Sequence, residues 1–430
     1  MRRINLGDAK SAASGWAAAI QLTSQYLAEN RKASQLLADL PDSFVGEARA
    51  RCQSLFLGAL RHGFRVRDAL RPHLRHPPGR VLEAALLVAG AELIESAPGL
   101  RPKIVHHAVE QAKRFAPARD LAFLNAVLRR LPEALDRQDP ERAPAVWFSH
   151  PAWLVDRWTA CFGPEAARRL LEWNQGIPDT FLRIYGARPV PEGLSPTPWP
   201  GFHRVEKAGA LRQEPLAALL AAGEAYVKDP STRLAPELLA PAAGERVLDL
   251  CAAPGGKAFD LARAMGGRGL LVAVDLPGER MPRLRENLAK LESKDFQAVP
   301  LESDLLELDR SLLEARGLPA AYDAVMLDAP CSNTGVIRRR TDVKWRLQPG
   351  DIAACAKLQQ QLIHSAARFV ASGGRLVYST CSIEADENRA IVDDFLASDS
   401  GRPFRLSAEV RCLPWDCGHD GATAFRLDRD

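Results

Sequence analysis

The 430-residue sequence lacks the features that mark several large protein classes. It has no apolar run of the roughly 18 residues that cross a bilayer, and its first residues lack the apolar core of a signal peptide. Its eight cysteines include no Cys-x-x-Cys pair, and thiols scattered over so long a chain do not form a disulfide framework. We therefore expect a cytoplasmic protein of about two to three domains, with reduced thiols and neither membrane nor metal.

Two common phosphate-binding patterns are also missing from a glycine-rich stretch in the C-terminal half. The stretch Asp249-Leu-Cys-Ala-Ala-Pro-Gly-Gly-Lys257 has no Gly-Lys-Ser/Thr ending and no Gly-x-Gly-x-x-Gly pattern, so a phosphate ligand is disfavoured. Asp275 follows about twenty residues later, where an acid can accept hydrogen bonds from both hydroxyls of a ribose. Asp304, after the next short strand, is placed to meet an adenine edge. These positions together fit a nucleoside without a pyrophosphate.

Basic charge is concentrated at the front of the chain. Residues 1–150 carry 22 Lys and Arg against 15 Asp and Glu, whereas the remainder carries 35 against 38. The stretch from Arg61 to Arg67 continues to Arg71, Arg75, His76 and Arg80. Such a patch can neutralise phosphates without reading sequence, and an ordinary solvated helical surface explains it equally well.

Hydrophobic periodicity predicts a helical front part. Apolar residues recur at three- and four-residue spacing in 18–37, 81–93 and 121–131, which indicates an all-helical bundle over residues 1–140. A polar stretch with two prolines at 137–144 is the expected connector. A mixed α+β region is expected over 146–235, and no regular element is assigned to its proline-rich stretch at 189–200.

The part from residue 236 to 430 alternates apolar strands with helices. The expected strands are 247–250, 270–274, 324–327 and 376–378, and the expected helices are 256–265, 280–291, 351–370 and 387–397. This alternation predicts an α/β fold with a doubly wound, parallel, Rossmann-like sheet.

Two cysteines stand directly after strands of this sheet. Cys331 lies in Leu327-Asp-Ala-Pro-Cys-Ser332 and Cys381 in Val377-Tyr-Ser-Thr-Cys-Ser382. Because the carboxyl ends of parallel strands meet at one edge, both thiols should overhang the same edge as the glycine-rich loop. The cysteines interpreted instead as small buried hydrophobes are Cys52, Cys161, Cys355 and Cys412, and Cys251 is interpreted as lining the loop. The pair predicts an enzyme that attacks its substrate with a thiolate.

With these motifs in this order, residues 225–428 resemble the RNA cytosine-C5 methyltransferases that use S-adenosylmethionine. The matching positions include Lys228 to Ser231, the loop to Lys257, Asp275 with Arg280 and Asn287, Asp304, Asp328 to Gly335, Arg338 to Trp345, Gly373 to Ser382, Glu387-Asn388 and His419-Asp-Gly421. The helical front, with Phe123 to Arg130, resembles the NusB-like RNA-binding domain of the branch that modifies 16S ribosomal RNA. Lys228 and Ala258 depart from the usual pattern, which has glutamine and a small hydroxyl residue there.

The resemblance implies a role for each catalytic residue. Cys381 would be the nucleophile that adds to C6 of the cytosine, and Cys331 would assist release of the product. Asp328 would hold N3 and N4 of the base, while Lys257 would favour the thiolate or orient the base. The expected cofactor-binding residues are Cys251, Ala252, Ala253, Pro254, Gly255, Gly256, Lys257, Asp275, Arg280, Asp304 and Asp328.

The implied substrate is a cytidine in ribosomal RNA that is single-stranded or unstacked, because the base must be reached at both C5 and C6. Arg338 to Arg340, Lys344 and Arg346 are expected to grip flanking phosphates, with Trp345 stacking nearby or anchoring the core, and Arg183 is a further candidate contact. A monomer is expected. The alternatives are a transfer RNA methyltransferase with the same catalytic domain, a DNA cytosine methyltransferase and a non-catalytic ribosome-assembly factor.

Overall fold

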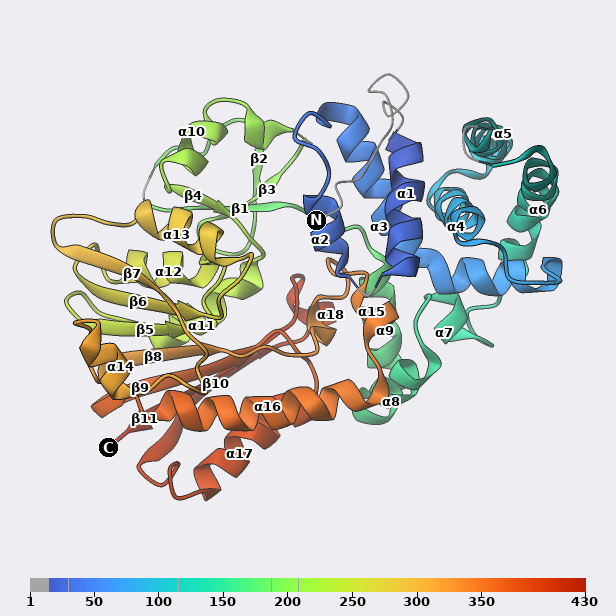
Figure 1. The fold of residues 1–430 in the computed structure, drawn as a ribbon. Helices are drawn as coiled ribbons and strands as arrows, with labels where there is room; N and C mark the ends of the chain where they lie inside the picture. Colours follow the sequence, from blue (N-terminus) through green and yellow to red (C-terminus); the bar gives the residue numbers. More distant parts are fainter. Residues whose placement is uncertain (1–14, 30, 114–115, 187, 208) are drawn as a thin grey trace. The chain divides into compact units, whose positions relative to one another are not determined.

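The computed structural model describes residues 15–29, 31–113, 116–186, 188–207 and 209–430. They divide into two compact units, coloured along the sequence in Figure 1. The helical unit holds the described residues up to Ile177 together with 337–347, and the sheet unit holds 178–336 and 348–430. In this described part of the chain, no helix is long and apolar enough to cross a membrane.

The described residues of the helical unit form helices and connecting loops, without a β-strand. The α-helices are α1 (Gly15–Ala28), α2 (Ala33–Ala38), α3 (Gly46–Leu70), α4 (Arg80–Glu95), α5 (Arg101–Ala112), α6 (Ala118–Asp136), α7 (Pro144–Trp147), α8 (Ala152–Phe162), α9 (Pro164–Gln175) and α15 (Val343–Arg346). The segment expected at 18–37 comprises α1 and α2, and those at 81–93 and 121–131 lie inside α4 and α6. Helix α4 is buried along most of its length, and α3 packs closely on it: a Cβ at Gly90 would lie 2.5 Å from Val66 Cγ1. The helical front predicted from periodicity is confirmed.

Residues 337–347, which follow the Pro-Cys motif in the sequence, belong to the core of the helical unit. Lys344 is 1% exposed, and its Nζ donates to the Arg61 carbonyl at 2.5 Å. Trp345 Nε1 donates to the Leu60 carbonyl at 2.7 Å, and a Cβ at Gly63 would lie 2.2 Å from the Trp345 ring. The expectation that Lys344 grips RNA phosphates is therefore wrong, because its amino group already binds a backbone carbonyl inside this unit. Of the two roles expected for Trp345, the structure shows the core anchor.

The basic stretch that begins at Arg61 is only partly a surface. Arg61 is 4% exposed and pairs with Glu95 at 3.2 Å, and His62 contacts the same carboxylate at 3.1 Å. The members that stay exposed are Arg67, which pairs with Glu83 at 2.7 Å, and Arg71, Arg75, His76 and Arg80. A phosphate-binding role therefore rests on the second half of the stretch.

A small antiparallel sheet opens the sheet unit. Its strands are β1 (Phe181–Ile184), β2 (Leu194–Pro196), β3 (Phe202–Val205) and β4 (Ala225–Val227), in the order β2-β3-β1-β4, with helix α10 (Leu216–Ala221). Strand β2 lies in the proline-rich stretch at 189–200, where no regular element is predicted from the sequence. It is short and pairs only with β3, which suits an edge strand that carries proline.

The large sheet has seven strands in the order β10-β11-β9-β8-β5-β6-β7. Its strands are β5 (Arg246–Leu250), β6 (Gly269–Asp275), β7 (Phe296–Glu302), β8 (Tyr322–Asp328), β9 (Val370–Thr380), β10 (Phe404–Cys412) and β11 (Ala422–Arg429). Strands β5 to β9 are parallel, and β10 and β11 add an antiparallel edge that the sequence did not predict. The Rossmann-like fold is confirmed, with this mixed edge as the difference.

Helices cover both faces of the large sheet (Figure 1). One core includes α11 (Leu234–Leu239), α12 (Gly256–Ala264) and α13 (Met281–Ala289), and the other includes α14 (Arg310–Ala315), α16 (Pro349–Ala367) and α17 (Arg389–Ala397). Adjacent residues of β5 point into different cores, Val247 into the first and Leu248 into the second. A strand that is buried on both faces has a continuous run of apolar residues, and such a run predicted this strand from the sequence.

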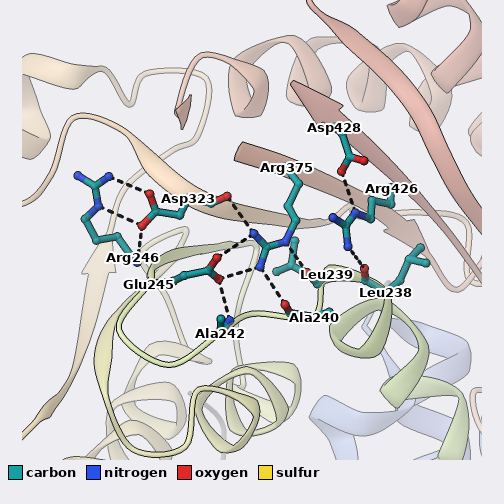
Figure 2. Close-up of polar contacts among 10 residues, drawn as sticks. All are labelled: Leu238, Leu239, Ala240, Ala242, Glu245, Arg246, Asp323, Arg375, Arg426 and Asp428. Carbon is teal, nitrogen blue, oxygen red and sulfur yellow. Dashed lines mark hydrogen bonds and ion pairs between the residues drawn. The ribbon is translucent and has the colours of Figure 1, made fainter. Parts of the chain in front are cut away.

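An ion-pair network closes the amino edge of the parallel strands (Figure 2). Arg375 binds the Glu245 carboxylate at 2.7 Å and donates to the carbonyls of Leu239 and Ala240, at 2.6 and 2.9 Å, where α11 ends. Arg246 pairs with Asp323 at 2.9 Å, so the starts of β5 and β8 are joined. The opposite, carboxyl edge is where the predicted site residues gather.

Candidate active site

The carboxyl edge of the large sheet brings the sequence motifs together. The chain runs from β5 outward through β6 to β7, then returns to β8 on the other side of β5. Such a reversal makes a topological switch point, where ligands of open α/β sheets bind. The glycine-rich loop follows β5, Asp275 ends β6, Asp328 ends β8 and Cys381 follows β9. The predicted convergence on one edge is therefore what the structure shows.

Cys331 and Cys381 are the central pair of the site. Their Sγ atoms lie 3.3 Å apart, and both cysteines are free thiols. The Cys381 thiol and burial raise the pKa of Cys331 well above its ordinary value. Cys331 therefore keeps its proton at neutral pH and can donate it in a hydrogen bond toward Cys381.

Asn333 contacts both cysteines, through the main chain of Cys331 and the thiol of Cys381. It has a φ of 63°, in the left-handed region that asparagine tolerates better than most residues. Its Nδ2 donates to the Cys331 carbonyl at 2.7 Å, and its Oδ1 lies 3.5 Å from Cys381 Sγ. The sequence analysis gave Asn333 no role, although its place two residues after Pro-Cys was visible.

Lys257 and Asp328 form an ion pair beside the thiols. Lys257 Nζ lies 2.5 Å from Asp328 Oδ2, and Ser379 Oγ donates to Asp328 Oδ1 at 3.1 Å. Burial lowers the pKa of Lys257, but Asp328, with a smaller contribution from Cys381, outweighs it, so that the pKa is raised. Lys257 is therefore a fixed cation close to Cys381, which favours the thiolate form of a nearby cysteine.

Glu387 ties the turns of both cysteines together, and the sequence analysis assigned it no role. This fully buried carboxylate accepts hydrogen bonds from Ser332 N at 2.8 Å, Ser382 Oγ at 2.5 Å and Gln359 Nε2 at 3.0 Å. Ser332 and Ser382 directly follow Cys331 and Cys381 in the sequence. One acid thereby sets the separation of the two thiols.

The turn that carries Cys381 has a second support in Asn388. Asn388 Oδ1 accepts from Thr380 Oγ1 at 2.7 Å, and its Nδ2 donates to the Ser382 carbonyl at 2.9 Å. These bonds hold the residues on either side of Cys381. The Glu387-Asn388 pair was noted in the sequence only as part of a resemblance, and its contacts give the physical reason for it.

The glycine-rich loop is held open by Asp275 and its partners. Asp275 accepts from Ala253 N at 2.8 Å and from Leu276 N at 2.9 Å, and it pairs with Arg280 at 3.0 Å. Gly255 has a φ of 99°, which favours glycine, and a Cβ there would lie 3.1 Å from Leu284 Cδ1. Asp275 and Arg280 thus position the loop.

Asp249, at the end of β5, is a site residue that the sequence analysis did not single out. It is 0% exposed, and neither carboxylate oxygen has a hydrogen-bond partner within the described chain. Burial, together with the charges of Asp328 and Asp275, raises its pKa well above the ordinary value. A buried carboxyl group without a partner costs free energy, which a cationic ligand in the loop would reduce. The site therefore suits a ligand that carries positive charge.

The remaining predicted residues lie around the same loop. Asp304 follows β7, and its Oδ1 accepts from Leu306 N at 2.9 Å. Lys228 pairs with Asp260 at 2.5 Å and donates to the Gly256 carbonyl at 2.9 Å, and burial lowers its pKa to about 8. Arg183 lies 3.1 Å from the same Asp260 carboxylate, so its charge is already paired.

Of the four cysteines interpreted as buried hydrophobes, Cys52 is buried, Cys355 and Cys412 are half-buried, and Cys161 is exposed. The interpretation is therefore wrong for Cys161.

Comparisons with known proteins match both parts of the chain. The family described as 16S rRNA methyltransferase RsmB/F matches residues 236–406, and the NusB family matches residues 14–133. Ribosomal RNA small subunit methyltransferase B of Vibrio cholerae is 35% identical over 342 residues, which are 74% of each chain. The protein of that name from Proteus mirabilis is 33% identical over 288 residues, so the chain spans 64% of its length.

Solved structures share the fold. The crystal structure of PH0851 matches with a TM-score of 0.74 at 22% identity, covering 96% of this chain and 99% of that one. NSun6 from Pyrococcus horikoshii with SFG matches with a TM-score of 0.53 at 17% identity, covering 65% and 98%. At these identities the likeness speaks for the fold alone.

Proposed function

Because the chain belongs to the 16S rRNA methyltransferase RsmB/F family, we propose that it methylates C5 of a cytidine in 16S ribosomal RNA with S-adenosylmethionine as donor. The observation that carries this proposal is the pair of thiols 3.3 Å apart, next to the ion pair of Lys257 and Asp328. A methyl transfer to carbon needs a covalent activation that one thiol performs and another helps to reverse.

The loop from Cys251 to Lys257 would hold the cofactor, with Asp275 at its ribose and Asp304 at its adenine. When bound, S-adenosylmethionine supplies an electrophilic methyl group on a sulfonium. The partnerless carboxyl group of Asp249 behind this loop fits a cofactor that carries positive charge. Asp275 already accepts two backbone N–H groups, so it would bind the ribose with the remaining capacity of its oxygens.

Cys381 would open the reaction by adding its thiolate to C6 of the cytosine. This step forms a sulfur–carbon bond and moves the C5–C6 π electrons onto C5 and, through C4, toward N3. Asp328 would bind N3 and N4 and favour a protonated N3, which offsets the developing negative charge. Lys257, held at 2.5 Å from Asp328, would orient this carboxylate and favour the thiolate form of Cys381. C5 then has the electron density that a methyl group requires.

Cys331 would act after methyl transfer. The C5 proton would pass to a base such as a water molecule, and the electrons of the C5–H bond would restore the C5–C6 double bond. The bond between Cys381 Sγ and C6 would break at the same time and return the thiolate. A protonated Cys331 at 3.3 Å stabilises the leaving Cys381 thiolate by donating a hydrogen bond. Removal of Cys331 is thus expected to leave the covalent adduct formed and slow its release.

The target cytidine would be unstacked or in a loop, since C6 must face Cys381 while C5 faces the cofactor. The exposed residues Arg71, Arg75, His76 and Arg80 of the helical unit are the proposed contacts to RNA phosphates. Their replacement should weaken binding to all RNA sequences about equally and reduce its dependence on salt.

The proposed activity is tested with S-adenosylmethionine labelled in its methyl group and protein-free 16S RNA. The wild type is expected to label one cytidine, found as 5-methylcytidine after nuclease digestion and mapping of the site. Cys381→Ala should abolish labelling, and the exposed control Cys161→Ser should retain it. If the label appears in transfer RNA instead, or on a carbon or nitrogen other than C5, the proposed substrate or position is refuted.

A further inference from the structure

A second group of thiols lies away from the catalytic pair, around the short helix α18 (Pro414–Cys417) between β10 and β11. Cys412 ends β10, Cys417 ends α18 and His419 follows two residues later. One ligand atom from each of these residues lies within 4.8 Å of the others. The main chain thus brings three soft ligand atoms to one point.

One ring nitrogen of His419 is already bound to the main chain. Its Nδ1 lies 2.8 Å from the Asp420 carbonyl oxygen, which can only accept, so Nδ1 carries the hydrogen. Nε2 is then the nitrogen with a lone pair to offer. A histidine that binds a metal commonly donates its other N–H to a carbonyl in this way. His419 is 2% exposed, and its ring contacts that of Trp199 at a centroid distance of 5.4 Å, which fixes its direction.

We propose that Cys412, Cys417 and His419 bind one Zn²⁺ ion, with water or another small ligand in the fourth position. The donor set selects a borderline-soft metal, since Ca²⁺ and Mg²⁺ need oxygen ligands. A gap of four residues between two cysteines is within the spacing found in zinc sites. Zn–S and Zn–N bonds of about 2.3 and 2.0 Å place tetrahedral ligand atoms roughly 3.6 Å apart, so only a small closure of the cluster is needed.

The site would stabilise the loop that supports the catalytic turn. Asp420 N donates to Asp229 Oδ1 at 3.2 Å, and Gly421 N donates to the Gly335 carbonyl at 2.8 Å. Gly335 N in turn donates to the Cys381 carbonyl at 3.0 Å. A Cβ at Gly421 would lie 2.9 Å from Gly335 Cα, so these two backbones are in close contact. A metal at His419 therefore fixes a segment two residues from the support of Cys381.

This proposal replaces the expectation from the sequence that no metal is bound. That expectation came from the lack of Cys-x-x-Cys pairs, and Cys412 was interpreted as a buried hydrophobe. Only the folded loop shows that Cys412 and Cys417 meet a histidine. The catalytic pair is a separate place in the same unit, where the partners of the two thiols are Asn333 and each other.

Metal content of the full-length, reduced protein tests the site directly. The protein is stripped with a chelator, given one equivalent of Zn²⁺, dialysed and analysed by mass spectrometry of the metal. About one zinc per chain is expected in the wild type and in Cys161→Ser, with at least a tenfold weaker affinity in Cys417→Ser. An apoprotein that takes up no zinc overturns the proposal. So does zinc retained equally by Cys417→Ser, or lost from the Cys331→Ala/Cys381→Ala double variant, because the metal then sits on other thiols.

Cobalt substitution and thermal unfolding give readouts independent of activity. Co²⁺ in the wild type should show an ultraviolet charge-transfer band from thiolate and the visible bands of a tetrahedral ion. Circular dichroism establishes that Cys417→Ser is folded before these bands are compared. Zinc should raise the unfolding temperature of the wild type and of Cys161→Ser and leave that of Cys417→Ser unchanged. A folded wild type without the charge-transfer band or the temperature shift contradicts the site.

Discussion

The Sγ atoms of Cys331 and Cys381 lie 3.3 Å apart, although 50 residues separate the two in the sequence. Two thiolates at this distance would repel one another, so one of the pair keeps its proton. The raised pKa of Cys331 makes it the protonated member. We therefore expect the shared proton of the pair to reside on Cys331.

Alkylation is expected to distinguish the two thiols. At neutral pH, iodoacetamide should react with Cys381 before Cys331, because thiolates and not thiols are alkylated. Cys331→Ala removes a hydrogen-bond donor to the Cys381 thiolate and should slow alkylation of Cys381 by about tenfold. Peptide mass spectrometry identifies the modified residue. Preferential modification of Cys331 in the wild type would reverse the assignment of states.

Asp249→Asn should stabilise the protein without cofactor at neutral pH. The raised pKa of Asp249 means that the folded state binds its proton more tightly than the unfolded state does. The stabilisation by this group is therefore fully present below its pKa in the unfolded state, which is about 3.9. It is lost as the pH rises through its pKa in the folded state. At pH 7 the free energy of unfolding of the variant should be about 1–3 kcal/mol higher than that of the wild type. The wild type should become more stable as the pH falls from 7 to 5, and the variant should not.

The cofactor affinity of Asp249→Asn is expected to change in the opposite direction. A neutral amide removes the favourable interaction with a cationic ligand, so binding of S-adenosylmethionine measured by calorimetry should weaken about tenfold. Binding of the product S-adenosylhomocysteine, which lacks the sulfonium charge, should change less. Equal losses for both ligands would mean that the charge of Asp249 is not what the site uses.

Glu387→Ala should lower activity by disturbing the turns that carry both cysteines. The change leaves the Ser332 N–H buried without its acceptor, at a cost of about 1–3 kcal/mol. We expect roughly a 10- to 100-fold lower rate of methyl transfer with little change in the affinity for S-adenosylmethionine. Glu307→Ala, an exposed acid on the same unit, is the control. A normal rate of methyl transfer for Glu387→Ala would show that this carboxylate does not position the two cysteines.

Trp345→Ala should destabilise the helical unit by about 3–5 kcal/mol, as is usual for truncation of a large core side chain. Its ring lies against Gly63, and its Nε1 binds the Leu60 carbonyl at 2.7 Å. Chemical denaturation followed by circular dichroism measures the change, and the exposed Val45→Ala is the control. If Trp345→Ala kept full stability but bound RNA weakly, the stacking role expected from the sequence would be restored.

Most of the catalytic edge could be predicted from sequence because its residues follow strands with strong apolar patterns. Asp328 ends a buried strand, Cys331 follows three residues later, and the loop to Lys257 lies within seven residues of the end of β5. Parallel strands end at one edge of a sheet. Partners that come from helices or distant loops carry no such signal. Glu387 and Asn388 lie on a short turn before α17, and nothing local indicates that they bind the thiol-bearing turns.

For the basic segment after the Pro-Cys motif, the prediction from the sequence was wrong. Charge alone predicted that Lys344 contacts RNA, yet this lysine is 1% exposed and bound to the Arg61 carbonyl. Composition reports charge but not burial, and a lysine can be buried where a carbonyl accepts from it. The division of the chain also depends on long-range packing, since residues 337–347 join a unit that ends in sequence at Ile177.

Trapping with RNA that contains 5-fluorocytidine tests the central claim most directly, because fluorine at C5 cannot leave as a proton does. With S-adenosylmethionine, the wild type and Cys331→Ala should each form a covalent complex with 16S RNA on a denaturing gel. Cys381→Ala should form none, and peptide mapping should place the nucleotide on Cys381. A complex that persists in Cys381→Ala and disappears in Cys331→Ala would contradict the assignment of the nucleophile.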